Sequence, residues 1–174
     1  MAYTSQLAKI MKKILLIGVC ALFLSHAGFA QNQRLYGTWR LVSSVSTVVS
    51  TGEKYYPLGK APAGYITYGP GGRMQVIIVS DQRASPSHAA IADMTDQERK
   101  DLLMSLTAYA GTYDFDGKTV THHIELSWNQ LWSGTDQSRD VHFDGNVLIF
   151  TSRPAPSPKD GRMSTVTVVW EKVN

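Results

Sequence analysis

Cysteine and surplus charge are both scarce in this sequence of 174 residues. The only cysteine, Cys20, lies in an apolar stretch near the amino terminus, so residues 31–174 have no disulfide, thiolate nucleophile or cysteine metal site. Residues 1–30 hold three lysines and no acid, which leaves 14 basic and 14 acidic residues in 31–174. Because nucleic-acid binding needs an excess of Lys and Arg, this zero net charge argues against nucleic acid or an anionic membrane surface as a partner.

Residues 1–30 have the pattern of a secretory signal peptide. A basic start at 11–13 precedes an apolar run of 11 residues at 14–24, which is too short to span a bilayer as a helix, and small residues follow at 27, 28 and 30. We therefore predict cleavage after Ala30 and a periplasmic or secreted protein without a stable membrane anchor. The alternative is an amino-terminal membrane anchor.

Helical periodicity is rare in residues 31–174, where short segments alternate between polar and apolar at period two and Gly-rich turns separate them. The segments predicted as strands are 37–45, 65–68, 73–79, 109–115, 119–128, 135–143, 147–151 and 163–171. A single helix is predicted from about Asp96 to Thr107, because Thr95 and Glu98 form a capping-box pattern. Its leucines, at 102, 103 and 106, are expected to cover one end or flank of the fold.

About eight antiparallel strands with one helix predict an all-β fold, an up-and-down barrel in a single domain of residues 31–174. Closure removes the exposed strand edges that a flat sheet would carry, and a barrel of this size has room for side chains or one small ligand. A β-sandwich is the main alternative.

Several motifs resemble those of the bacterial and fungal lipocalin-like domain family, in the same order and over almost all of residues 35–173. They are Gly-x-Trp at 37–39, Gly-Tyr-Ile-Thr-Tyr at 64–68, Gly-Arg-Met at 72–74, Tyr-Ala-Gly-Thr-Tyr at 109–113, His-His at 122–123, Trp-Ser-Gly-Thr-Asp-Gln-Ser-Arg at 132–139 and Val-Trp-Glu at 169–171. The resemblance implies a calycin-type barrel. It implies little about activity, because fold similarity does not locate a site.

Strand alternation predicts which side chains face the inside of the barrel. His122 is expected inside, whereas His123 and Glu125 are expected in solvent. The other expected inward residues are Met74, Val76, Ile78, Tyr109, Tyr113, Phe115, Val120, Ile124, Leu126, Trp128, Gln137, Arg139, Val141 and Phe143. In the first strand, one face is expected to carry Trp39, Leu41, Ser43 and Val45.

The predicted ligand-binding residues are the polar members of this interior together with one methionine: Met74, Tyr109, Tyr113, His122, Gln137 and Arg139. An inward arginine needs a partner, so Arg139 either binds a ligand or stacks on Trp39 to close the barrel, a role for which Arg162 competes. A neutral core His122 bonded to a tyrosine is favoured over a catalytic one. His123 and Glu125 offer two metal ligands without a third, so we predict no metal site and no cofactor.

Three functions are compatible with this pattern. The favoured one is an exported protein that binds a small apolar or aromatic molecule in the barrel cavity, because no catalytic motif is evident. The alternative is a cofactor-free isomerase, cyclase or hydrolase, with His122 as general base, Tyr109 or Tyr113 as acid, and Arg139 holding a developing negative charge. The third is a structural or cell-envelope protein. The sequence does not name the ligand or the oligomeric state.

Overall fold

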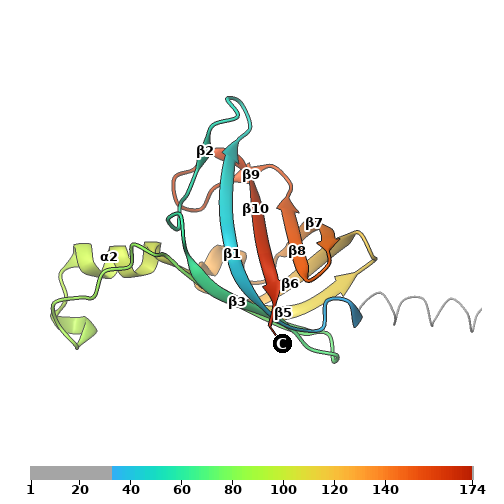
Figure 1. The fold of residues 1–174 in the computed structure, drawn as a ribbon. Coiled ribbons are helices and arrows are strands. Elements are labelled where there is room, and N and C mark those ends of the chain that lie inside the picture. Colours follow the sequence, from blue (N-terminus) through green and yellow to red (C-terminus); the bar gives the residue numbers. More distant parts are fainter. Residues whose placement is uncertain (1–32, 174) are drawn as a thin grey trace, which may run out of the picture.

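The computed structural model describes residues 33–173, so the predicted signal peptide and its cleavage site lie outside the described residues. Within this range, eight antiparallel strands form a closed barrel, as predicted (Figure 1). They are β1 (Gly37–Val48), β3 (Ala63–Tyr68), β4 (Arg73–Val79), β5 (Leu106–Phe115), β6 (Thr119–Ser127), β7 (Asp136–Asp144), β8 (Val147–Ser152) and β10 (Met163–Lys172). Neighbours in this series pair with each other, and pairing of β1 with β10 closes the barrel and rules out the sandwich.

Short elements complete the chain between these strands. They are β2 (Lys54–Tyr55), η1 (Ile91–Asp93), α2 (Asp96–Met104), η2 (Gln130–Trp132) and β9 (Ala155–Pro156). The long connections that contain β2, α2, η2 and β9 meet one end of the barrel, which we call the loop end. The other end, where tight turns join β3 to β4, β5 to β6 and β7 to β8, we call the closed end.

Packed side chains fill the closed end. Leu35 and Trp39 are almost completely buried there, and the Trp39 indole N–H donates to the Leu35 carbonyl at 2.8 Å. Lys172 covers this tryptophan, with its Nζ 4.4 Å from a ring centroid of Trp39. The prediction that Arg139 or Arg162 stacks on Trp39 is therefore wrong. Arg162 instead lies 3.6 Å over the Tyr55 ring, near the loop end.

A bulge in β1 changes which of its residues face inward. The register of β1 against β10 shifts by one residue at Val42, which is 50% exposed. An extra residue reverses the alternation beyond it. Ser44 and Ser46 are therefore buried on the inner side, and the prediction that Ser43 and Val45 share a face with Trp39 and Leu41 is wrong.

A second bulge reverses the end of β6. Glu125 is the extra residue in the pairing of β6 with β5, so Leu126 is 68% exposed instead of inward as predicted. Trp128 lies beside Leu126 in a groove that is separate from the inner cavity. Gly111 makes the bulge possible, because a Cβ there would come within 1.9 Å of the His123 carbonyl oxygen.

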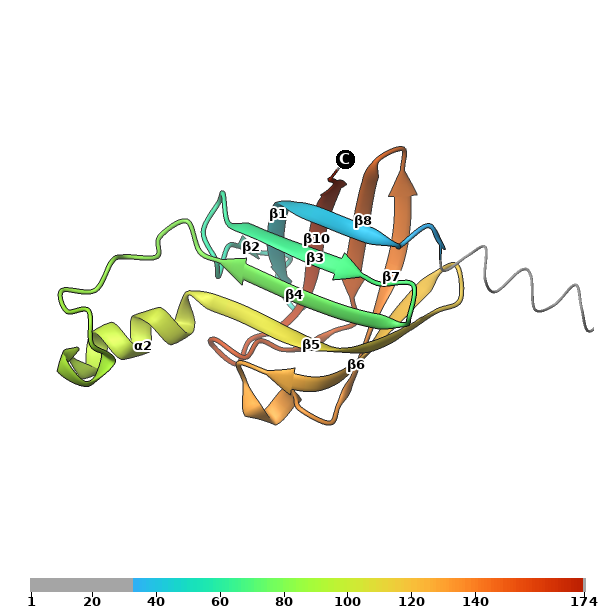
Figure 2. The same ribbon diagram turned by 90° about the horizontal axis from the view of Figure 1, so that it is seen from below.

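Helix α2 stands clear of the barrel in two perpendicular views (Figures 1 and 2). The predicted capping box is present: Glu98 donates its backbone N–H to Thr95 Oγ1 at 3.2 Å and accepts from the Thr95 N–H at 2.8 Å. The helix ends at Met104 and not at Thr107 as predicted, and Leu106 is the first residue of β5. None of the helical residues is buried, so the prediction that Leu102 and Leu103 cover an end of the barrel is wrong. The first six residues of the helix are polar, so its start offers no apolar stripe to dock. Among the described residues, no helix is both long and apolar enough to cross a membrane.

Candidate functional site

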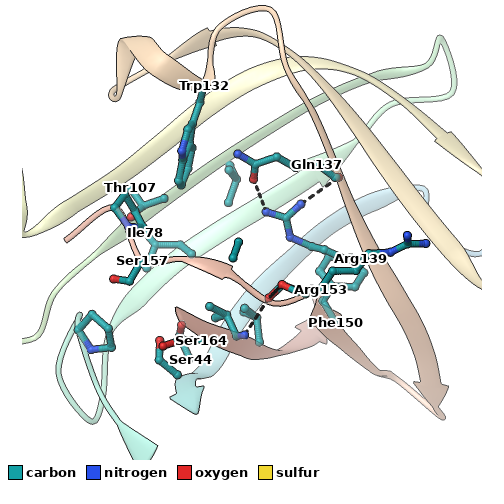
Figure 3. A pocket seen from close by; sticks show the side chains of 18 of the residues that line it. Ser44, Ile78, Thr107, Trp132, Gln137, Arg139, Phe150, Arg153, Ser157 and Ser164 are labelled. Carbon is teal, nitrogen blue, oxygen red and sulfur yellow. Dashed lines mark hydrogen bonds between the residues drawn. The ribbon is translucent and has the colours of Figure 1, made fainter. Parts of the chain in front are cut away.

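An inner cavity of about 470 Å³ lies toward the loop end (Figure 3). Its volume is that of a site for one small molecule. Most of the wall is apolar and comes from inward side chains of the strands and from the segment that precedes β3. The apolar lining includes Leu58, Ile66, Val76, Ile78, Phe150, Val166, Val168 and Trp170.

Two polar residues of β7, Gln137 and Arg139, form one part of the cavity wall. They are two residues apart and therefore share a face of the strand. Arg139 Nη2 donates to Gln137 Oε1 at 2.8 Å, and its Nη1 donates to the Gln137 carbonyl at 3.1 Å, as the dashed lines of Figure 3 show. The guanidinium carbon lies 5.9 Å over the ring of Tyr109, which also lines the cavity. These contacts fix the orientation of the guanidinium.

His122 lies behind this wall and is fully buried. Its Nε2 is 2.6 Å from the Tyr68 hydroxyl and its Nδ1 is 3.1 Å from the Tyr109 hydroxyl. Burial, followed by the charge of Arg139, lowers the pKa of His122 well below its usual value. The predicted core position and the bond to a tyrosine are confirmed. The lowered pKa favours the neutral ring, in which one nitrogen donates and the other accepts.

The two phenols beside His122 are also neutral. Burial raises the pKa of Tyr68 and of Tyr109. Arg139 Nη1 lies 3.4 Å from His122 Nδ1, at the edge of this cluster. Arg139 therefore carries the only charge of the group formed by these four side chains.

The remaining predicted residues, Tyr113 and Met74, belong to the packed half of the barrel. Tyr113 donates to the Gly69 carbonyl at 3.1 Å and packs edge-on against Tyr68, and burial raises its pKa to about 12. Met74 is 3% exposed. The six predicted residues thus divide into three that line the cavity, Tyr109, Gln137 and Arg139, and three that lie behind it, Met74, Tyr113 and His122.

Sequence reasoning missed several lining residues. Ser44 and Ser46 reach the cavity only because of the bulge in β1, and Trp132 reaches it from η2, where its ring packs edge-on against Tyr109 at 5.9 Å. Trp132 begins the family motif at 132–139, so the resemblance was the signal that could have identified it as a lining residue. Arg153 and Lys159 line the cavity from the Pro-rich connection between β8 and β10, which the sequence marks only as a loop.

Positively charged side chains outnumber negatively charged ones among the residues that line the cavity. Arg139, Arg153 and Lys159 line it together with one carboxylate, that of Asp136. Asp136 Oδ1 is already 2.7 Å from His123 Nδ1. The cavity therefore combines an apolar wall with an excess of positive charge.

His123 faces outward, as predicted, and lies between two carboxylates on the barrel surface. Its ring nitrogens are 2.7 Å from Asp136 and 3.0 Å from Asp114, and these hydrogen bonds raise its pKa. Within residues 33–173, no group of three or more His, Cys, Asp or Glu side chains is arranged to hold a metal ion.

The sequence profile of the lipocalin-like domain matches residues 36–173, which is most of the chain. The chain belongs to the lipocalin-like domain family. The resemblance inferred from the motifs is thereby confirmed, and a barrel of this family with an inner cavity is consistent with small-molecule binding. None of the curated proteins compared with the chain matches it.

Proposed function

We propose that this lipocalin-like protein is exported and binds one small apolar or aromatic molecule in its inner cavity. The observation that carries the proposal is the uneven filling of the barrel: side chains pack the closed end, whereas the loop end holds a partly open cavity of about 470 Å³ with a mostly apolar wall. Export rests on the signal-peptide pattern of residues 1–30. Amino-terminal sequencing of the exported form should begin at Gln31, and an uncleaved or lipidated amino terminus would contradict export.

Binding is favoured over acid–base catalysis by the position of His122. A general base has to reach the proton that it removes, directly or through one water. Both ring nitrogens of His122 are occupied by Tyr68 and Tyr109, and the residue is not part of the cavity lining. The geometry therefore assigns His122 a supporting position in the wall and gives the enzymatic alternative no specific support.

The test of binding is a fluorescence titration with N-phenyl-1-naphthylamine, an uncharged aromatic probe that brightens in apolar surroundings. Val166 lines the cavity, whereas Thr167, the next residue of β10, points to the opposite face. We expect wild-type protein to bind one equivalent of probe. Val166→Trp should fill the cavity and weaken binding at least tenfold, and Thr167→Trp should leave it within about twofold of wild type.

Two results would contradict the proposed function. One is the absence of saturable binding by folded wild-type protein. The other is equal binding by wild type and both variants, which would place the probe outside the cavity. Thermal melts of the two variants show that any loss of binding belongs to folded protein.

A further inference from the structure

The cavity wall contains hydrogen-bond donors that have no acceptor in the protein. A guanidinium has five N–H donors, and Arg139 makes three hydrogen bonds, to Gln137 and His122, which leaves two. Trp170, a second lining residue, is 2% exposed, and its indole N–H has no hydrogen-bond partner. The Trp128 indole N–H, outside the cavity, is also unpaired. Inside the cavity, a ligand that carries an acceptor would satisfy the buried donor of Trp170 and the part-buried donors of Arg139.

The charge of Arg139 is also unbalanced within the protein. It forms no ion pair with any carboxylate of residues 33–173. Its polar neighbours His122, Tyr109 and Gln137 are neutral. A part-buried cation without a counter-ion is unfavourable unless a bound anion completes the site.

The rest of the wall increases this imbalance. Arg153 adds an exposed cation at the edge of the cavity, and Lys159 lines it with its ammonium bonded to the Met104 carbonyl and lying over the Trp128 ring. The only lining carboxylate, that of Asp136, is hydrogen-bonded to His123. The remaining surface is mostly apolar. Such a wall accommodates an apolar body and, at one point, a negatively charged head.

We propose that the ligand is an amphipathic organic anion, with an apolar or aromatic body in the cavity and a singly charged head, such as a carboxylate, on Arg139. This rests on the proposed function and adds the class of ligand to it. Gln137 holds the guanidinium in place through two hydrogen bonds, so its free N–H groups are oriented before the ligand arrives.

The test compares two probes that differ by one charge. N-phenyl-1-naphthylamine is neutral, and 8-anilino-1-naphthalenesulfonate has the same ring skeleton with a sulfonate. Both are titrated into wild type, Arg139→Met, Arg139→Lys and the control Arg40→Met, whose arginine is paired with Glu171 on the exposed barrel surface. We expect Arg139→Met to weaken sulfonate binding at least ten times more than it weakens neutral binding. Arg139→Lys should retain part of the sulfonate affinity, and Arg40→Met should match wild type.

The possible failures are distinguishable. If neither probe binds wild type, the proposed function fails and the ligand class fails with it. If both probes bind but Arg139→Met leaves sulfonate binding unchanged, or weakens both probes equally, the proposed ligand class alone is overturned.

A second measurement needs no variant of Arg139. Bound N-phenyl-1-naphthylamine is displaced from wild-type protein by 1-naphthoate or by 1-naphthamide, which have nearly the same shape but differ in charge. We expect the carboxylate to displace the probe at a concentration at least ten times lower than the amide. Equal potency would overturn the anionic head.

Discussion

At the residue scale, the contact between Tyr68 and His122 shows how a buried polar pair is satisfied in the middle of the barrel. Sequence alternation places His122 inside, but it does not identify Tyr68 as its partner, because the two residues are 54 positions apart in the chain. The 2.6 Å contact, together with that from Tyr109, leaves no ring nitrogen unpaired. The pair stabilises the fold by satisfying groups that would be costly to bury alone.

Tyr68→Phe should destabilise the protein by about 1–3 kcal/mol, because it leaves one buried nitrogen of His122 without a partner. Tyr65→Phe is the matched control, since Tyr65 lies on the same strand and is 50% exposed. Urea denaturation followed by tryptophan fluorescence measures both changes. Equal stability of Tyr68→Phe and Tyr65→Phe would show that the contact contributes nothing.

The low pKa of His122 predicts how the stability of the fold depends on pH. The folded-state pKa lies well below the ordinary value, whereas the unfolded chain titrates near 6.5. Below about pH 6.5 the unfolded state therefore binds a proton that the folded state does not, and the contribution of His122 to stability, complete above that pH, falls as the pH is lowered. Tyr68, Tyr109 and Arg139 surround the ring and provide no negative charge.

Imidazole nitrogen shifts recorded by NMR from pH 8 to pH 5 separate this residue from its neighbour. His122 should stay neutral over most of the range, while His123, between two carboxylates, should titrate above the ordinary value. A titration midpoint for His122 at or above pH 6.5 would contradict the burial and the uncharged contacts described for its ring.

At the element scale, α2 has a well-formed start but little contact with the barrel. Thr95→Ala removes the side-chain half of the capping box, which costs about 1 kcal/mol of helix stability. Because α2 stands clear of the barrel, we expect the loss to be local. Amide exchange over 98–104 should accelerate about fivefold, with little change in the Tm of the whole protein. Thr95→Ser should match wild type, and unchanged exchange in Thr95→Ala would contradict the role of the cap.

The bulge between β5 and β6 makes a sharper prediction. Gly111→Ala places a Cβ 1.9 Å from the His123 carbonyl oxygen, so the strands have to separate, and we expect a loss of about 1–3 kcal/mol or more. Gly71→Ala is the control, because no atom lies within 4 Å of its new Cβ. Comparable stability of the two variants in urea would contradict the close approach.

At the scale of the whole molecule, the closed barrel could be predicted because strand alternation and turn dipeptides are local signals. The separation of His122 from His123 was predictable for the same reason, since β6 alternates without interruption up to Ile124. The bulges at Val42 and Glu125 were not predictable, because each depends on how a strand pairs with its neighbour: β1 with β10 at the other end of the chain, and β6 with β5 across a hairpin. Beyond each bulge the inward and outward faces are exchanged.

The position of the cavity depends on packing that no single segment encodes. Tyr109, Gln137 and Arg139 were identified from alternation, but the same argument selected Met74 and Tyr113, which lie in the packed half. Alternation tells inside from outside and does not tell one end of the barrel from the other. The docking of α2 was mispredicted for a related reason: its cap is a local feature, whereas its contacts are not.

The most direct test of the central claim, binding inside the loop end of the barrel, is an NMR titration of labelled protein with N-phenyl-1-naphthylamine. Backbone amide shifts show which part of the molecule the probe touches. The account predicts that the largest shifts occur at cavity-lining residues, namely Ser44, Ser46, Arg139, Val166 and Val168. Shifts confined to the exposed outer groove, at Tyr65, Ile77 and Leu126, would contradict it.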